Sequence, residues 1–202
     1  MGNVKDATVS DMRRANKVLQ RAKCEPVELK YKAVGNIEEA KLLVFHDASF
    51  ANLRGEGSQG GFLIFLANQL NQSLFLISWQ SRKLKRVVNS TLSAETMQLI
   101  DAAGKGYWIR CFFEEIFNIA PSIQCLTDSK TLYDAVHSTK QVLDNRLRVD
   151  LAILKEIIRN KEVNRITWVS KEQQIADCLT KQGASCKNLL FTLATGALKQ
   201  EK

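Results

Sequence analysis

Short apolar runs bounded by polar residues or by Gly mark five strands along the chain. Three lie close together, at residues 41–49, 62–66 and 74–79, and two follow later, at 123–128 and 163–169. No charged residue occurs between 57 and 81, but the Asn and Gln residues in the middle of this stretch argue against a membrane span. Its two apolar runs are instead typical of a β-hairpin.

Apolar residues at helical spacing predict helices before, between and after these strands. We expect a long helix at 90–118, in which Gly104 and Gly106 weaken or bend the middle. The other expected helices are an amphipathic one at 10–24 and four more at 129–137, 145–160, 173–181 and 187–197.

Three strands joined by tight turns and followed by α/β units predict an α/β fold, with a mixed five-stranded sheet flanked by helices. We expect 1–40 to be a connector or appendage with one amphipathic helix, 41–182 to be the main domain and 183–202 to be a helical tail. The chain has 202 residues, 45% of them hydrophobic and 25% charged, which suits one globular domain and excludes a disordered or fibrous chain.

Charge and cysteine usage narrow the possible partners and compartments. The 29 basic and 21 acidic residues leave a net charge of +8, which favours nucleic acid or another anionic partner. Five Cys without C-x-x-C spacing and only two His favour free thiols over disulfides or a zinc site, and hence a cytoplasmic or nuclear protein. The first residues match neither a secretory signal nor a myristoylation motif.

Four acidic residues occupy positions where a charge is unfavourable or well placed for ligand binding. Asp47 and Asp128 end apolar strands, whereas Glu95 and Asp177 fall in the first turns of expected helices. Each could be no more than a helix cap or a favourable charge at a helix terminus. Together, four carboxylates without a histidine pair suit Mg²⁺ or Mn²⁺, and two such ions can promote phosphodiester hydrolysis.

Five segments, in this order, resemble the RNase H domain at the end of copia-type LTR retrotransposon polyproteins. They read HDASF at 46–50, ISWQSRK at 77–83, STLSAE at 90–95, LTDSK at 126–130 and IADCLTK at 175–181. Residues 5–25 also resemble the connector that joins reverse transcriptase to RNase H in that family. One departure is that residues 163–176 contain no His, whereas many cellular relatives carry one in a catalytic loop before the last acid.

The resemblance implies an RNase H-like fold and a retrotransposon-derived endonuclease that hydrolyses the RNA strand of RNA–DNA hybrids with two Mg²⁺ ions, or Mn²⁺. Asp47, Glu95, Asp128 and Asp177 correspond to the metal-binding catalytic acids. A reverse transcriptase domain of the parent polyprotein is a further expected partner. Two alternatives remain, an inactive RNase H-like module that binds nucleic acid or supports a polymerase, and a DNA nuclease. The sequence predicts no oligomeric state.

A basic segment lies between Trp79 and the helix that carries Glu95. Its four cations, Arg82, Lys83, Lys85 and Arg86, are expected to contact nucleic-acid phosphates, although a solvated loop has the same composition. The cations between 146 and 161 are expected to form an ordinary helix surface.

Five further residues are expected to have structural roles. Strand alternation points His46 away from the face that Asp47 occupies. Core packing is expected for Cys125, Cys178, Trp108 and Trp168.

Overall fold

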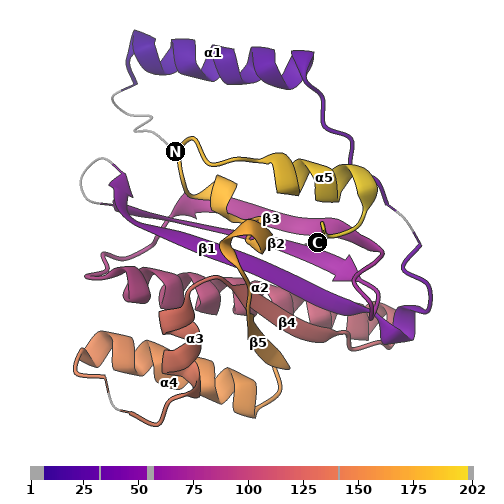
Figure 1. Cartoon of the computed structure of the whole chain (residues 1–202), viewed down its shortest axis with the longest axis vertical. Helices are drawn as coiled ribbons and strands as arrows, with labels where there is room; N and C mark the ends of the chain where they lie inside the picture. Colours follow the sequence, from indigo (N-terminus) through magenta and orange to yellow (C-terminus); the bar gives the residue numbers. More distant parts are fainter. Residues whose placement is uncertain (1–6, 32, 54–56, 141, 200–202) are drawn as a thin grey trace.

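A five-stranded mixed sheet forms the centre of the molecule (Figure 1). The computed structural model describes residues 7–31, 33–53, 57–140 and 142–199. In chain order the elements are α1 (Val9–Cys24), η2 (Ile37–Glu39), β1 (Lys41–Leu53), β2 (Gly57–Ala67), β3 (Leu74–Lys83), α2 (Thr91–Phe117), β4 (Ser122–Thr127), α3 (Lys130–His137), α4 (Asn145–Arg159), β5 (Arg165–Trp168), η3 (Lys171–Gln173), η4 (Asp177–Leu179) and α5 (Lys187–Thr195).

The strand order β3-β2-β1-β4-β5 places β1 in the middle of the sheet. β1 pairs antiparallel with β2, and β2 pairs antiparallel with β3, which confirms the predicted hairpin. β4 runs parallel to β1, and β5 runs parallel to β4. The carboxyl ends of β4 and β5 therefore point the same way as the later part of β1, and residues that follow these strands meet at one edge.

Because side chains alternate along β1, they pack into two separate hydrophobic cores, one on each face of the sheet. Leu42 and Val44 pack toward α2 with residues of α3 and α4. Leu43 and Phe45 pack on the opposite face, which is covered by the segment after β5 and by α5. Figure 1 shows this division, with α2, α3 and α4 on one side of the sheet and α5 on the other.

Two glycines of β2 let neighbouring elements approach the sheet closely. A Cβ on Gly60 would lie 2.0 Å from Oε1 of Gln98 in α2. A Cβ on Gly61 would lie 2.7 Å from the Cβ of Leu179 in η4. β2 begins at Gly57, earlier than the predicted run at 62–66, and its glycines allow α2 and η4 to pack against the strand.

The long helix and the segment after β5 differ from the sequence predictions. α2 is continuous from Thr91 to Phe117, since Gly106 packs against β1 rather than breaking the helix. The helix predicted at 173–181 is wrong, because only the short 3₁₀ turns η3 and η4 form there. The side-chain oxygen of Gln174 accepts the N–H of Ala176, a local bond that competes with helical pairing.

The residues before β1 form a helix and an extended connection. α1 begins with a capping box between Thr8 and Asp11 and has no buried residue, and Figure 1 shows it beyond α5. The connection lies against the hairpin, where the Tyr31 ring meets that of Phe75 edge-on and Ser73 donates a hydrogen bond to the carbonyl of Ala33. None of the described helices is long and apolar enough to span a membrane.

Candidate active site

Asp47 is a buried carboxylate in the central strand of the sheet, with 1% of its surface exposed. The hydroxyl of Thr180 donates a hydrogen bond to its Oδ2, and the Lys181 Nζ lies 3.3 Å from its Oδ1. Burial raises the pKa of Asp47 to about 6, and the neighbouring charges of Asp177 and Asp128 add to this effect. Thr180 and Lys181 oppose the shift.

Asp128 and Asp177 join Asp47 in what we call the aspartate cluster. Asp128 follows β4, the parallel neighbour of β1, and Asp177 begins η4 after the chain has passed β5. One carboxylate oxygen from each of the three residues lies within 4.8 Å of the other two. Burial, followed by the charge of Asp177, raises the pKa of Asp128. Asp47 and Asp128 are 81 positions apart in the sequence, and Asp128 and Asp177 are 49 positions apart. The topology of the sheet brings all three together.

The ammonium group of Lys181 forms ion pairs with two members of this cluster. Its Nζ lies 2.7 Å from Oδ1 of Asp177, in addition to its contact with Asp47. Burial alone would lower the pKa of Lys181, but the hydrogen bond to Asp177 and the charges of the cluster raise it well above its usual value. Lys181 therefore partly neutralises three carboxylates that repel one another.

Glu95, the fourth predicted acid, lies close to the aspartate cluster without being a member of it. It is buried in the first turns of α2, after the Ser90 cap. Burial raises its pKa well above the usual range, and the charges of Asp47 and Asp128 raise it further. The backbone N–H of Ala48 donates a hydrogen bond to the carboxylate and opposes the shift. Its Oε2 points to the His46 ring, 3.8 Å from Nδ1.

Gln174, Thr180 and Lys181 contact the site but were not singled out from the sequence. The Gln174 amide donates a hydrogen bond of 2.9 Å to the carbonyl of His46, and its side chain also bonds to Asp128. Thr180 and Lys181 belong to the 175–181 segment that carried the family resemblance, so their position in that motif was the available signal. No comparable signal marked Gln174.

Four carboxylates without a nitrogen or sulfur ligand form a donor set that fits Mg²⁺ or Mn²⁺. Burial raises the pKa values of Asp47, Asp128 and Glu95, and the one nearby ammonium group, that of Lys181, offsets this only in part. A divalent ion would supply that charge. The residues present therefore fit the metal that the sequence predicts.

The basic segment does not form one free patch. Arg82 and Lys83 belong to β3, and Arg82 makes two bonds of 2.7 and 2.8 Å to the Asp101 carboxylate of α2. Arg86 forms an ion pair with the buried Asp150 of α4. Lys83 and Lys85 are exposed, and the Lys83 side chain extends along Gly57. Two of the four predicted phosphate contacts are thus engaged with acids of the protein.

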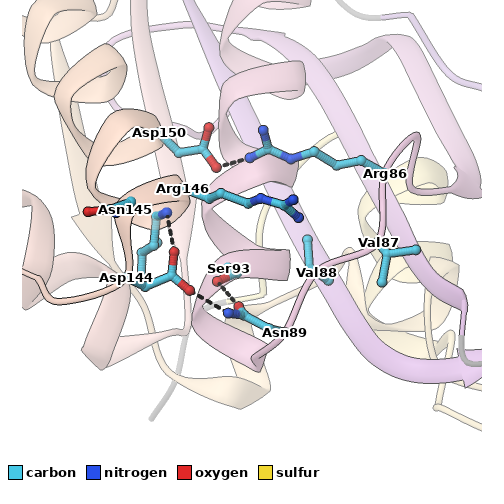
Figure 2. Close-up of a pocket in the computed structure, with 10 residues that line it drawn as sticks. Arg86, Val87, Val88, Asn89, Ser93, Asp144, Asn145, Arg146 and Asp150 are labelled. Carbon is cyan, nitrogen blue, oxygen red and sulfur yellow. Dashed lines mark hydrogen bonds and ion pairs between the residues drawn. The ribbon is translucent and has the colours of Figure 1, made fainter.

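The Arg86–Asp150 pair borders a cavity of about 340 Å³ between α4 and the loop before α2 (Figure 2). Asn89 donates a hydrogen bond to Asp144, the N-cap of α4, and accepts one from Ser93. These contacts tie the loop to both helices. The cavity thereby lies beside the start of α2, the helix that carries Glu95.

The aromatic residues differ from expectation more than the histidine and the cysteines do. Trp108 and Trp168 are 59% and 47% exposed, so the prediction that they pack in the core is wrong. The outer face of α2 has no covering element among the described residues, and Trp168 donates its indole N–H to the carbonyl of Asp128. Cys125 is buried as predicted, and Cys178 is half-buried. His46 is buried on the face opposite Asp47, as strand alternation predicts.

Comparison with known proteins supports the fold. No family model matches the chain, and no curated protein does. Among solved structures, LC11-RNase H1, isolated from compost by a metagenomic approach, is 16% identical over 69% of this chain and 92% of its own, with a TM-score of 0.51. LC11-RNase H1 in complex with RNA/DNA hybrid is 15% identical over 69% and 94%, with a TM-score of 0.50. The chain has an RNase H-like fold, which confirms the predicted fold class.

Proposed function

We propose that this chain is a metal-dependent endonuclease that hydrolyses the RNA strand of RNA–DNA hybrids. The observation that carries the proposal is the aspartate cluster, in which three carboxylate oxygens lie within 4.8 Å at one edge of an RNase H-like sheet. Fold alone does not define an activity, but these side chains supply the chemistry that such a reaction requires. LC11-RNase H1, which has the same fold, has been seen in complex with an RNA/DNA hybrid.

Asp47, Asp128 and Asp177, with Glu95 beside them, would hold two Mg²⁺ ions, and Mn²⁺ would fit the same oxygens. Bound ions of this kind lower the pKa of water and stabilise the charge that develops on the phosphate. Asp47 is buried and accepts a hydrogen bond from Thr180, so its carboxylate has a defined orientation. The charge of Lys181 lowers the pKa values of Asp47, Asp128 and Glu95 and so favours their ionised forms, and a bound ion would take over this role.

We further propose that the chain derives from a copia-type LTR retrotransposon and acts beside a reverse transcriptase domain. Support comes from the five sequence segments in family order and from α1, an amphipathic helix without a buried residue at the position of the family's connector. Recognition of a hybrid would depend on backbone shape and 2′-hydroxyl groups rather than on base sequence.

A second candidate is a module of the same fold that binds hybrids without cleaving them. It is favoured by Lys181, whose ammonium group contacts two members of the aspartate cluster. In this alternative Lys181 would replace the metal permanently.

A strand-specific cleavage assay separates the two candidates. The purified chain is mixed with a hybrid labelled on either the RNA or the DNA strand, in Mg²⁺, Mn²⁺ or excess chelator, with double-stranded RNA and DNA as control substrates. We expect internal cuts in the RNA strand of the hybrid alone, and only with a divalent ion. Binding without cuts in both metals would support the non-cleaving module. Cuts in double-stranded DNA would indicate a DNA nuclease.

A further inference from the structure

His46 and Glu95 face each other in the interior, and neither side chain is satisfied. The His46 ring is fully buried, and both of its nitrogens lack a hydrogen-bond partner among the described residues. The Oε2 of Glu95 also lacks one, and it lies 3.8 Å from Nδ1 of His46. Buried polar atoms are almost always paired, so two unpaired atoms that point at each other indicate an interaction.

The two residues come from different elements, β1 and α2. His46 immediately precedes Asp47 in β1, and its side chain points toward α2. Glu95 extends from the first turns of α2 toward β1 and already accepts the backbone N–H of Ala48. An approach of about 1 Å would bring Nδ1 and Oε2 to hydrogen-bond distance.

The ring can donate a hydrogen bond to the carboxylate. An imidazole carries at least one ring N–H. Glu95 has to be ionised in order to hold a cation, and an ionised carboxylate in this interior needs donors. The N–H of Ala48 is one such donor, and the ring can be the second.

We propose that His46 is a positioning residue, whose Nδ1–H donates a hydrogen bond to Oε2 of Glu95 and fixes that carboxylate beside the aspartate cluster. This inference deepens the proposed function and rests on it, because Glu95 needs a fixed orientation only if the acids hold a metal. Residues that orient a metal ligand through such a bond commonly change metal affinity when they are replaced.

Two substitutions test the role of the ring nitrogen. His46→Leu keeps the apolar volume but removes the donor, whereas His46→Asn places an amide N–H where Nδ1 lies. Mn²⁺ affinity, measured by calorimetry on the full chain, should fall about 10- to 100-fold in His46→Leu and stay near wild type in His46→Asn. Thermal unfolding confirms that both variants are folded. Equal affinities in the two variants would overturn the proposal.

A second measurement needs no variant. In ¹⁵N NMR spectra of the wild-type chain with saturating Mg²⁺ at pH 8, Nδ1 of His46 should be the protonated nitrogen. Protonation at Nε2 would overturn the proposal even if hybrids are cleaved. Conversely, the Nδ1–H tautomer and the difference between the Leu and Asn variants, without cleavage of any hybrid, would leave the positioning role standing and reject the proposed activity.

Discussion

At the residue scale, Asp47 combines the deepest burial in the aspartate cluster with contacts to two side chains that follow η4. Thr180 and Lys181 reach it from 133 and 134 residues away in the sequence. Its orientation therefore depends on the packing of η4 against β1 and β2. The same packing requires Gly61, since a side chain there would collide with Leu179.

We predict that Asp47→Asn abolishes cleavage while the fold and hybrid binding persist. An amide has nearly the volume of the carboxylate and can still accept the Thr180 hydroxyl, but it supplies no charge to a metal. The rate in Mg²⁺ should fall by more than about 100-fold, because even substitutions behind a metal ligand cost about 10- to 100-fold. Single-turnover cleavage measures the loss, and a binding assay measures affinity in chelator.

Asp134→Asn is the matched control, since it makes the same chemical change on the exposed surface of α3, where Asp134 forms an ion pair with Lys130. That variant should cleave at the wild-type rate. Near wild-type turnover of Asp47→Asn would exclude Asp47 from the metal site.

At the element scale, the strands and most helices follow from local patterns, because apolar runs and helical spacing depend on neighbouring residues. β5 is shorter than the predicted 163–169 run, yet Val163 and Val169 are both buried beside it. Asp128 could be placed at a strand end because β4 ends at Thr127. The end of β4 therefore predicts the position of Asp128.

Other features depend on contacts between distant segments, which a local pattern does not contain. Ile175, Ala176 and Leu179 have helical spacing, but the bonds from Gln174 to Ala176 and to the His46 carbonyl hold that segment out of a helix. Trp108 has helical spacing too, but no described element covers its face of α2. The ion pairs of Arg82 and Arg86 join residues 19 and 64 positions apart.

These ion pairs sharpen the prediction for the basic segment. If Lys83 and Lys85 contact phosphates, replacing both with Gln should weaken hybrid binding by similar factors for unrelated sequences. The slope of log affinity against log salt should become shallower by about 1 to 2, since each contact on a duplex contributes about 0.9. Cleavage at saturating substrate should change much less, because the acids are intact.

Lys17→Gln with Lys23→Gln on α1 is the matched control, as it removes the same charge from an exposed helix beyond α5 (Figure 1). This pair should leave the salt slope unchanged. Equal slopes for wild type and the Lys83→Gln, Lys85→Gln variant would mean that Lys83 and Lys85 are only solvated, and the proposed nuclease would then need other substrate contacts.

At the scale of the whole molecule, the buried acids link stability to pH and to metal. The pKa of Asp47 rises from 3.8 to about 6 on folding, so between these values the folded state binds more protons than the unfolded state. The free energy of unfolding therefore falls as pH rises through this range. For Asp47 alone the loss is about 3 kcal/mol, at 1.36 kcal/mol for each pKa unit. Glu95 and Asp128, whose pKa values are also raised, act in the same direction.

We predict that Mg²⁺ stabilises the chain strongly at pH 8 and weakly at pH 5, because Asp47, through which the folded state would bind the ion, has a pKa of about 6 and is largely protonated at pH 5. At a concentration of 100 times the dissociation constant, the gain is about 2.7 kcal/mol. For a chain of this size that raises the melting temperature by about 5–10 °C. Thermal unfolding with and without Mg²⁺ at both pH values measures the difference, and Asp47→Asn should lose most of the gain at pH 8. An equal gain at the two pH values, or an undiminished gain in Asp47→Asn, would place the bound ion away from the aspartate cluster.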